Sequence, residues 1–496
     1  MDIGTPLWAI SYVLVLLGFT VYGIHRYTVI FAFLRHRKKT PIPLGQFETL
    51  PVVTVQLPIF NERYVVGRLL DSVALLDYPK ELLQIQVLDD STDDSTKLID
   101  AHVEMLAAKG FDIKVLRRET REGYKAGALA NGLLEARGDY LFILDADFVP
   151  DPGILLRTIH HFTDPKVGMI QTRWGHLNRK HSILTRVQAM FLDGHLLLEQ
   201  TARSRSGRFF NFNGTAGIWR KSCIESAGGW QHDTLTEDLD LSYRAQLAGW
   251  RFVFLLDEVT PAELPVDMNG FKSQQHRWTK GSIQTCKKLL GKIWKAHLPF
   301  GVKLEATIHL TSNFMYLLLA FLCLLMHPDA PMPFPAEVKF WLIDLPVFAA
   351  ASISVLAFYL TAQCALHPRH WFREILLLPV LLALGIGLSI NNARAVLEAI
   401  FNRPSSFIRT PKYGAAASGS PEWYKLSYKP IDTLLPFVEL LFACYFTFCV
   451  TAAILDGNYS SVPFLMLFQL GFFYVAISSL YVQFRRRIQV PTPAQP

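Results

Sequence analysis

The sequence predicts a chain of two parts, an α/β domain built on a mostly parallel sheet and an α-helical part that crosses a membrane. Short β-branched runs alternate with helical stretches between residues 51 and 172, which is the order expected of a parallel sheet with helices on both faces. Apolar runs of bilayer length stand at 7–34 and recur through 306–484. The acidic residues concentrate in 48–280, between these apolar regions.

Residues 1–39 are expected to be an amino-terminal transmembrane anchor. The apolar run 7–34 is too long for the core of a signal peptide, and the basic stretch 35–39 (Arg-His-Arg-Lys-Lys) follows at once. Basic flanks stay on the cytosolic side of a membrane. We therefore expect a multi-pass protein of the inner (plasma) membrane whose catalytic domain lies in the cytosol.

The α/β pattern predicts strands and helices in strict alternation. The expected strands are 52–59, 84–88, 113–116, 140–144 and 168–172, with helices at 63–77, 93–109, 124–136 and 152–162 between them. Residues 210–215 read as a further strand and turn, and a helix is expected from Thr236 to about Gly249. In such sheets, ligands bind outside the carboxyl ends of the strands.

Carboxylates gather at that edge of the predicted sheet. Asp89 and Asp90 follow the second strand, and Asp145 and Asp147 follow the fourth. Each has a structural alternative, because aspartate also caps helices and favours turns. Four such charges at one edge would repel one another unless a divalent cation and a bound diphosphate relieved them.

Three further motifs lie outside these strand ends. Gly123–Ala128 opens a helix whose free N–H groups, with Lys125, could face an anion, although a lysine in a first turn is usually only solvated. Thr236-Glu237-Asp238 also opens a helix, where a capping role is the structural alternative. Residues 274–278 (Gln-Gln-His-Arg-Trp) bring an amide, a cation and an indole together just before the membrane half.

Taken in order, these motifs resemble those of the processive family 2 glycosyltransferases, the cellulose, chitin and hyaluronan synthases. The matching stretches are Asp89-Asp90, Lys125-Ala126-Gly127, Asp145-Ala146-Asp147, Phe212-Asn213-Gly214-Thr215, Thr236-Glu237-Asp238 and Gln274–Trp278. The stretch from Gln171 to Trp278 is most similar to the plant cellulose-synthase-like mannan and glucan synthases and their bacterial relatives. The likeness covers most of residues 50–300 and extends more loosely into the membrane half.

The resemblance implies a GT-A (Rossmann-like) fold for residues 40–280 and an inverting transfer from a nucleotide sugar. It implies that Asp89 and Asp90 hold the nucleotide, and that Asp147 with Asp145 binds Mg²⁺ or Mn²⁺. It makes Asp238 the general base, Arg277 the partner of the diphosphate and Trp278 the support of the acceptor sugar. The remaining residues expected at the site from these motifs are Glu237, Gln274, Lys125 and Gly214.

The chemistry calls for these residue types independently. A departing nucleoside diphosphate develops negative charge, which a metal ion and an arginine can stabilise. A sugar hydroxyl is a poor nucleophile, so a nearby carboxylate helps by taking its proton. The indole of Trp278 can pack on a pyranose face, and the structural alternative is an ordinary packing aromatic.

The membrane half is expected to hold two pairs of spans, 306–326 with 342–366 and 433–455 with 462–484. Before them, 281–305 reads as an amphipathic helix lying in the membrane interface. The apolar run 375–390 is ambiguous, but a crossing there would place the basic segment 394–429 outside the cell. We therefore expect 367–432 to include a re-entrant or interfacial element at 371–401, leaving five spans in all and a cytosolic tail at 488–496.

Residues 407–412 (Phe-Ile-Arg-Thr-Pro-Lys) resemble the gating loop of cellulose synthases. By that resemblance Thr410 and Lys412 would line the opening of the donor pocket. Arg409 and Pro411 depart from the commonest pattern of the loop, which weakens the case for a mobile gate. The alternative is a basic interfacial loop that binds anionic membrane lipid.

The function expected from the sequence is extension of a β-linked polysaccharide from UDP-glucose or GDP-mannose, with passage of the product through the chain's own spans. A second possibility is transfer of a single sugar to a membrane lipid such as ceramide or a polyprenyl phosphate. A third is a transporter or scaffold with an inactive transferase domain, against which the intact Asp147, Asp238 and Arg277 count. The partners expected are thus a nucleotide sugar, a growing glycan or lipid acceptor, and membrane lipid.

Other classes of function are disfavoured by composition. The net charge of +7 is modest, and the basic residues flank apolar runs, which fits a membrane face better than a nucleic-acid groove. No glycine-lysine loop of the Walker type is present, so hydrolysis of ATP or GTP by a P-loop is unsupported. The six cysteines show no CxxC spacing and predict neither a disulfide framework nor a zinc site.

Overall fold

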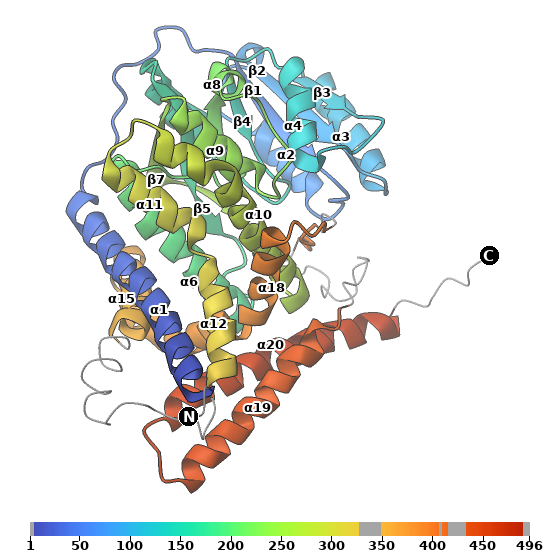
Figure 1. The fold of residues 1–496 in the computed structure, drawn as a ribbon. Coiled ribbons are helices and arrows are strands. Elements are labelled where there is room, and N and C mark those ends of the chain that lie inside the picture. The colour runs from blue at the N-terminus through green and yellow to red at the C-terminus, as the bar shows by residue number, and fades with distance from the viewer. Residues whose placement is uncertain (1–3, 327–348, 406–408, 415–432, 490–496) are drawn as a thin grey trace.

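The computed structural model describes residues 4–326, 349–405, 409–414 and 433–489. A seven-stranded sheet occupies one end of the molecule, and the long apolar helices α1, α12, α19 and α20 lie below it (Figure 1). The α/β class expected from the sequence is confirmed. The parts of the predicted segments at 327–348, 406–408, 415–432 and 490–496 lie outside the described residues.

The sheet has the order β3-β2-β1-β4-β6-β5-β7. Its strands are β1 Val53–Ile59, β2 Leu83–Asp89, β3 Asp112–Leu116, β4 Tyr140–Ile143, β5 Val167–His176, β6 Gly217–Arg220 and β7 Arg251–Ala262. All neighbouring pairs are parallel except those of β6, which runs antiparallel to β4 and β5. The five predicted strands are therefore present in their expected places.

Two strands differ from the sequence expectation. The strand expected at 210–215 is wrong, because those residues form an irregular turn and the strand β6 begins only at Gly217. Strand β7 was not anticipated, since its sequence, RFVFLLDEVTPA, is a nearly continuous apolar run interrupted by two acids. These two strands complete the half of the sheet that follows β4.

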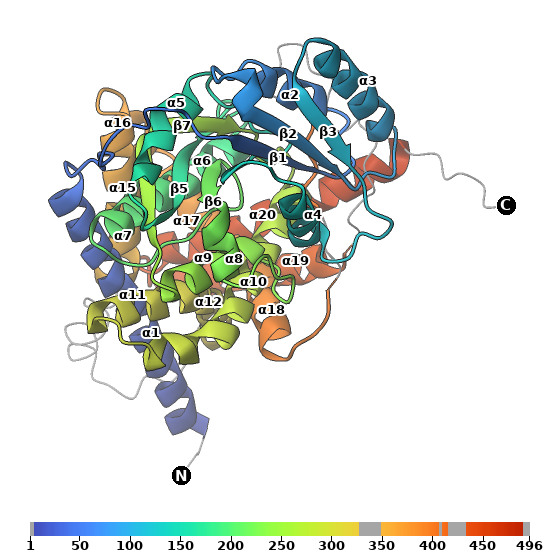
Figure 2. The same cartoon turned by 90° about the horizontal axis from the view of Figure 1, so that it is seen from above.

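Helices cover both faces of the sheet (Figure 2). On one face α2 Val66–Ala74, α3 Ser95–Ala108 and α5 Ile154–Thr158 pack on alternate side chains of β1, among them Val53, Val55 and Leu57. On the other face lie α4 Tyr124–Leu134, α8 Lys221–Ser226 and α9 Glu237–Leu247. The alternation of side chains along each strand accounts for the two separate cores.

Helix α10 joins the two parts of the chain. It runs unbroken from Met268 to Lys295, so residues 274–278 and the expected interfacial helix at 281–305 belong largely to one element. The apolar side of its second half, including Ile283, Leu289 and Ile293, is buried against α9, α11 and α18. Protein covers this apolar side of α10, and the expected boundary at 281 and the interfacial position of 281–305 stay predictions.

Four helices are long and apolar enough to cross a membrane among the described residues. They are Leu7–His36 in α1, Ala349–Leu366 in η5 and α15, Leu435–Leu455 (α19) and Val462–Arg485 in α20. The span expected at 306–326 corresponds to a pair of helices, α11 Phe300–Thr311 and α12 Phe314–Leu325, bent by 53°. Such a pair is either a broken span or a re-entrant loop, so the crossing at this segment stays a prediction.

The expected re-entrant element corresponds to a second bent pair. Residues Trp371–Gly387, which include α16 Trp371–Ile375 and α17 Leu378–Gly387, meet α18 Ser389–Ile400 at 40°. Such a break occurs both in a re-entrant element and in a broken span, so the non-crossing topology stays a prediction. The segment lies beside the catalytic part, because α18 packs on α10 through Ile283, Val396 and Ala399.

A buried ion pair fastens α10 to the last two helices. Lys272 on α10 donates to Glu439 on α19, with its Nζ 2.7 Å from Oε2 and 2.6 Å from Oε1. Both side chains are nearly sealed from solvent, at 4 % and 0 % exposed. Asn269, one turn earlier, donates to the carbonyl oxygen of Ser479 on α20. The helix that carries Gln274, Arg277 and Trp278 is thus fixed to the membrane half at its amino-terminal end.

Replacing Lys272 with methionine should destabilise the protein by about 3–5 kcal/mol, because Glu439 would keep a buried charge without its partner. The double variant Lys272→Met/Glu439→Leu should recover most of that loss. The measurement is the unfolding midpoint of the purified chain in detergent. Lys295→Met, at the exposed end of the same helix, is the matched control. A single variant as stable as that control would contradict the assigned burial of the pair.

Candidate active site

A cleft opens at the carboxyl ends of β1 and β4, between the sheet edge and helices α9 and α10. Every site residue expected from the sequence except Asp89 lines it. They come from segments as far apart in the chain as Asp90 and Lys412. The sheet edge, the start of α9 and the middle of α10 are therefore brought together as the motif order suggested.

Asp89 and Asp90 take different places. The Asp89 carboxylate is buried, accepting from Arg117 Nε at 2.9 Å and from the Ser91 N–H at 2.9 Å. Asp90 lines the cleft and is held by Arg118, whose Nε and Nη2 lie 3.0 and 2.5 Å from its oxygens. We expected both aspartates to bind the nucleotide, but they have different positions. Asp89 stabilises the end of β2, and Asp90 faces the cleft.

Lys125 and Asp145 form an ion pair on the cleft wall. Lys125 Nζ lies 2.5 Å from Asp145 Oδ1 and donates to the Gly214 carbonyl at 2.7 Å. Burial would lower the pKa of Lys125, but Asp145 and Glu237 outweigh it and raise that pKa above its ordinary value. The solvated alternative for this lysine is therefore wrong, because it bridges the strand end and the turn at Gly214.

Gly214 allows that turn to approach Asp238. Its φ of +85° lies in the left-handed region, and a Cβ placed there would lie 2.9 Å from Asp238 Oδ2. Only glycine adopts this conformation without strain. The glycine therefore keeps the carboxylate of Asp238 in place while the carbonyl oxygen of the same residue holds Lys125.

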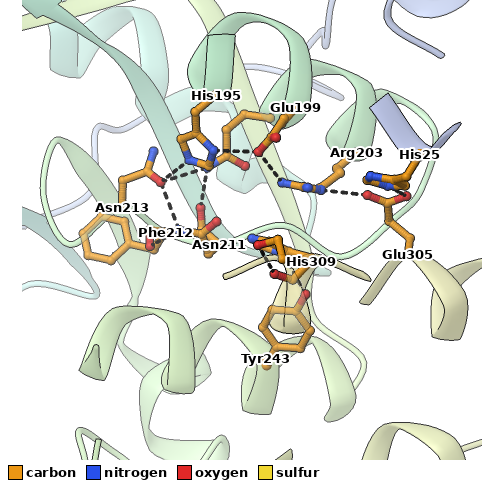
Figure 3. Close-up of polar contacts among 12 residues, drawn as sticks. His25, His195, Glu199, Arg203, Asn211, Phe212, Asn213, Tyr243, Glu305 and His309 are labelled. Carbon is orange, nitrogen blue, oxygen red and sulfur yellow. Dashed lines mark hydrogen bonds and ion pairs between the residues drawn. The ribbon is translucent and has the colours of Figure 1, made fainter. Parts of the chain in front are cut away.

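A partly buried polar network contacts the turn through Asn213 (Figure 3). His195 contacts Asn213 Oδ1 at 3.2 Å and Glu199 at 2.9 Å, and Arg203 continues the chain of contacts from Glu199 to Glu305. Glu305 also meets His25 of α1 at 2.9 Å. His195 and Glu199 lie on a π-helical turn, Gly194–Gln200, a local form that is common near functional sites.

Asp147 is paired with a residue 265 positions later in the chain. Lys412 Nζ lies 2.6 Å from its Oδ2, and the Glu263 N–H donates to the same oxygen at 3.1 Å. Burial raises the pKa of Asp147, and the positive charge of Lys412 opposes that rise. Thr410 lines the cleft beside Lys412, whereas Phe407 and Ile408 of the expected gating motif lie outside the described residues.

Arg409 contacts a carboxylate that the sequence analysis did not select. Its Nη1 lies 2.6 Å from Glu62 Oε1, just beyond the end of β1. Burial raises the pKa of Glu62 to about 7, although Arg409 and Lys412 favour its charged form. Glu62 followed the first predicted strand, so its position signalled a cleft residue, but its partner lies 347 positions later in the chain and could not be foreseen.

Asp238 stands at the start of α9 with Glu237 beside it. Thr236 occupies the cap position of this helix, but its side chain makes no capping hydrogen bond. Asp238 Oδ1 accepts from the Leu239 N–H at 2.8 Å, so this carboxylate also has the structural role of an acid in a first helical turn. Burial and the charge of Glu237 raise the pKa of Asp238 to about 7, while Lys125 and Arg277 act in the opposite direction. A carboxyl group with such a pKa can both take up and release a proton near neutrality.

Gln274, Arg277 and Trp278 reach the cleft from one face of α10. Their spacing of three and four residues places them side by side on consecutive turns. Burial lowers the pKa of Arg277, and Glu237, Asp145 and Asp238 counter that effect by favouring its charged form. The guanidinium of Arg277 therefore lies in the electrostatic field of these three carboxylates.

Comparison with known proteins identifies the family. The model of "Glycosyltransferase like family 2" matches residues 51–281. "Probable glucomannan 4-beta-mannosyltransferase 3" of Oryza sativa subsp. japonica is 32 % identical over 444 residues, which is 86 % of this chain and 78 % of the relative. "Glucomannan 4-beta-mannosyltransferase 7" of Arabidopsis thaliana is 33 % identical over 442 residues, with 86 % and 76 % covered. The chain belongs to glycosyltransferase family 2.

A solved structure supports the fold of this glycosyltransferase. The mannosyltransferase PcManGT from Pyrobaculum calidifontis, in complex with GDP-Man and Mn²⁺, aligns over 80 % of this chain and 99 % of its own, with a TM-score of 0.53. At 18 % identity the likeness shows the fold alone. The GT-A fold expected from the sequence motifs is confirmed.

The carboxylates of the cleft suit a divalent cation that is bound together with a diphosphate. Among the described residues no cluster of three or more histidine, cysteine, aspartate or glutamate side chains could hold a metal alone. Mg²⁺ and similar ions are, however, commonly held by one or two carboxylates plus substrate phosphates. Asp145 and Asp147 supply such a pair at one strand end, each now neutralised by a lysine. The residues present therefore fit a metal that arrives with its substrate.

Trp174 and His176 also line the cleft, near the end of β5. The sequence analysis selected neither Trp174 nor His176 as a site residue. The signal available was their place at the carboxyl end of a strand, where ligands bind in α/β sheets. That signal was masked because the strand was expected to end at residue 172, four residues before its actual end.

The pH dependence of the transferase should report Asp238. If this carboxylate must be ionised to accept a proton, kcat/KM should fall about tenfold per pH unit below its pKa of about 7. Because the charge of Glu237 raises that pKa, Glu237→Gln should move the acidic limb to lower pH. Asp238→Asn should remove the limb together with nearly all activity.

The measurement is a profile of kcat/KM between about pH 5 and pH 9, sampled at intervals of about half a pH unit. A Glu225→Gln variant, which alters a carboxylate on α8 outside the cleft lining, is the control and should leave the limb in place. An acidic limb that Glu237→Gln fails to shift would contradict the assignment.

Proposed function

We propose that the enzyme transfers mannose from GDP-mannose to the 4-hydroxyl of a growing β-linked glycan. The observation that carries the proposal is the similarity to glucomannan 4-beta-mannosyltransferases, which extends over more than three quarters of their length. That span includes most of the membrane half as well as the catalytic domain. Of the two donors expected from the sequence, the proposal selects GDP-mannose over UDP-glucose.

In the proposed inverting transfer, different cleft residues have different roles. Asp238, with its pKa near neutrality, would take the proton from the acceptor hydroxyl as that oxygen attacks the anomeric carbon. The bond from that carbon to the diphosphate breaks as the new glycosidic bond forms. Arg277 would stabilise the charge on the departing diphosphate, because a guanidinium forks onto phosphate oxygens.

Substrate binding would involve both ends of the cleft. Asp90, which faces the cleft while Asp89 is buried, would contact the nucleotide. Asp145 and Asp147 would hold Mg²⁺ or Mn²⁺, which supplies positive charge to the diphosphate when bound. Lys125 would stay beside Asp145, and Gln274 and Trp278 would support the acceptor sugar from α10.

Passage of the product into the membrane is part of the proposal. Polar side chains stand at both helix breaks beside α10, partly buried at the first and buried at the second, where a hydrocarbon-facing helix would carry none. Asn313 lies between α11 and α12 and accepts from Thr279 at 3.4 Å, one residue after Trp278. Asn391 and Asn392 lie just after the break between α17 and α18 and are buried. These groups are suited to line a path for a sugar chain.

The orientation we propose follows the positive-inside rule, with the catalytic domain in the cytosol of the inner (plasma) membrane. In it α1 crosses first, the two later helix pairs follow, and the bent segment Trp371–Ile400 enters without crossing. The basic residues around Arg403 then remain beside the catalytic domain, where Lys280 Nζ donates to the Arg403 carbonyl at 2.6 Å.

The test is synthesis by the purified full chain in lipid nanodiscs, supplied with Mn²⁺ and labelled GDP-mannose. We expect a product that grows in length with time and is cleaved by an endo-β-mannanase. UDP-glucose in place of GDP-mannose should give at least about tenfold less product, the discrimination expected of a site built to hydrogen-bond one base. Arg277→Ala should lose at least about 10²-fold in rate.

The result has three informative outcomes. Polymer from GDP-mannose supports the proposal, and polymer from UDP-glucose alone overturns the donor assignment. A single sugar recovered on a chloroform-soluble lipid would show a lipid glycosyltransferase instead. Arg186→Ala, which removes a half-exposed guanidinium on α6 outside the cleft lining, is the control for loss of an arginine.

A further inference from the structure

His176 presents one edge of its imidazole ring to the catalytic cleft. It is the last residue of β5, pairs in register with Ala262 of β7, and lines the cleft. Its side chain is only 6 % exposed. Gly175 before it keeps the two strands close, since a Cβ there would lie 2.9 Å from Val259 Cγ1. The ring is thus held by the sheet at the edge where substrates bind.

The other edge of the ring is fixed by a buried carboxylate. His176 Nε2 lies 3.0 Å from Oδ1 of Asp193, the last residue of α6 Ile183–Asp193. Asp193 also accepts from Arg179 at 2.6 Å and from Gln363 at 3.2 Å. Burial would raise the pKa of Asp193, but His176 and Arg179 outweigh it and hold that pKa well below its ordinary value.

This arrangement sets the tautomer of His176. An ionised carboxylate only accepts hydrogen bonds, so Nε2 carries a proton and the neutral ring has its lone pair on Nδ1. Within the part of the chain that the structure describes, Nδ1 has no hydrogen-bond partner and is not enclosed. When the ring is neutral, Nδ1 of this cleft-lining residue is a hydrogen-bond acceptor whose orientation is fixed by the bond from Nε2 to Asp193.

His176 lines the part of the cleft that is linked to the candidate membrane helices. Through Asp193 and Arg179 the ring is linked to Gln363 on α15, a candidate span, and Arg179 also lies 3.7 Å from Glu374 on α16. Asp90, by contrast, lies at the end of β2 and is held by Arg118, away from the apolar helices. A sugar chain moving from the cleft toward the membrane would pass the wall of His176.

We propose that His176 binds a hydroxyl of the acceptor sugar through Nδ1, and that Asp193 is the positioning residue that keeps Nδ1 free to accept. The inference rests on the proposed function, because it assumes a carbohydrate acceptor. A fixed acceptor atom discriminates between sugars whose hydroxyl points toward it and epimers whose hydroxyl points away. His176 is therefore a specificity-determining residue for the acceptor and takes no part in releasing the nucleotide.

Two substitutions separate this role from a structural one. Glutamine places its amide nitrogen where Nε2 lies, so His176→Gln keeps the bond to Asp193 and removes only the group that faces the cleft. Asparagine places its terminal atoms near Nδ1, so His176→Asn keeps a polar group toward the cleft and removes the partner of Asp193. If His176 had only a structural role, His176→Asn would lower acceptor kcat/KM more than His176→Gln. The proposed role predicts the opposite order.

The experiment measures two rates with the full chain in nanodiscs. One is release of GDP from GDP-mannose by hydrolysis without acceptor, and the other is kcat/KM for a manno-oligosaccharide acceptor. His176→Gln should leave hydrolysis within about twofold of the wild type and lower the acceptor kcat/KM about three- to tenfold, the worth of one neutral hydrogen bond. His176→Asn should retain more acceptor kcat/KM than His176→Gln.

A nitrogen-15 NMR spectrum of the histidine-labelled chain supplies a readout that packing alone would not move. The signal that disappears in His176→Gln should be that of a ring protonated at Nε2 and unprotonated at Nδ1. A ring protonated at Nδ1 would overturn the inference, and so would equal losses of hydrolysis and transfer. If the wild type neither hydrolyses GDP-mannose nor transfers mannose from it, the proposed function is wrong. This result differs from failure of the His176 inference, which requires an active wild type.

Discussion

The structure depends on balancing a group of carboxylates that meet in one buried cleft. Asp145, Asp147, Asp238 and Glu62 converge there, and burial raises the pKa values of Asp147, Asp238 and Glu62 toward their neutral forms. The balance comes from cations supplied by distant segments, namely Lys125 of α4, Arg277 of α10, and Arg409 and Lys412 near the carboxyl-terminal helices. Charge neutrality in the cleft thus ties the sheet, the membrane half and the 409–414 segment together.

This balance also explains how one cleft can serve several steps of glycosyl transfer. If a diphosphate binds with a divalent cation as proposed, it would meet a site already lined by both charges, and Asp145 and Asp147 would exchange their lysine partners for the cation. Lys412 on Asp147 and Lys125 on Asp145 occupy the positions where the metal would act. Asp238 differs from these paired carboxylates, because burial and the charge of Glu237 raise its pKa to about 7. It is therefore the group suited to take up and release a proton.

Helix α10 connects chemistry to the membrane. Its first turns are fixed to α19 and α20 through Lys272 and Asn269, its middle carries Arg277 and Trp278 into the cleft, and its last turns pack on α9 and α11. A movement of the apolar helices would therefore be transmitted to the part of the cleft that Arg277 and Trp278 line. His176, which is hydrogen-bonded to Asp193, lines the same cleft.

The sequence by itself determined strands β1 to β5, the carboxylate edge and the positions of the longest apolar helices, because these follow from periodicity and local composition. It also placed Asp90, Asp147, Asp238, Arg277 and Trp278 at one site through the order of their motifs. It did not separate the buried Asp89 from Asp90, did not show that 274–295 is one packed helix, and did not reveal His176. Only the tertiary structure decided these points, because each depends on a partner far away in the chain: Arg117 for Asp89, α9 and α11 for α10, and Asp193 with Gln363 for His176.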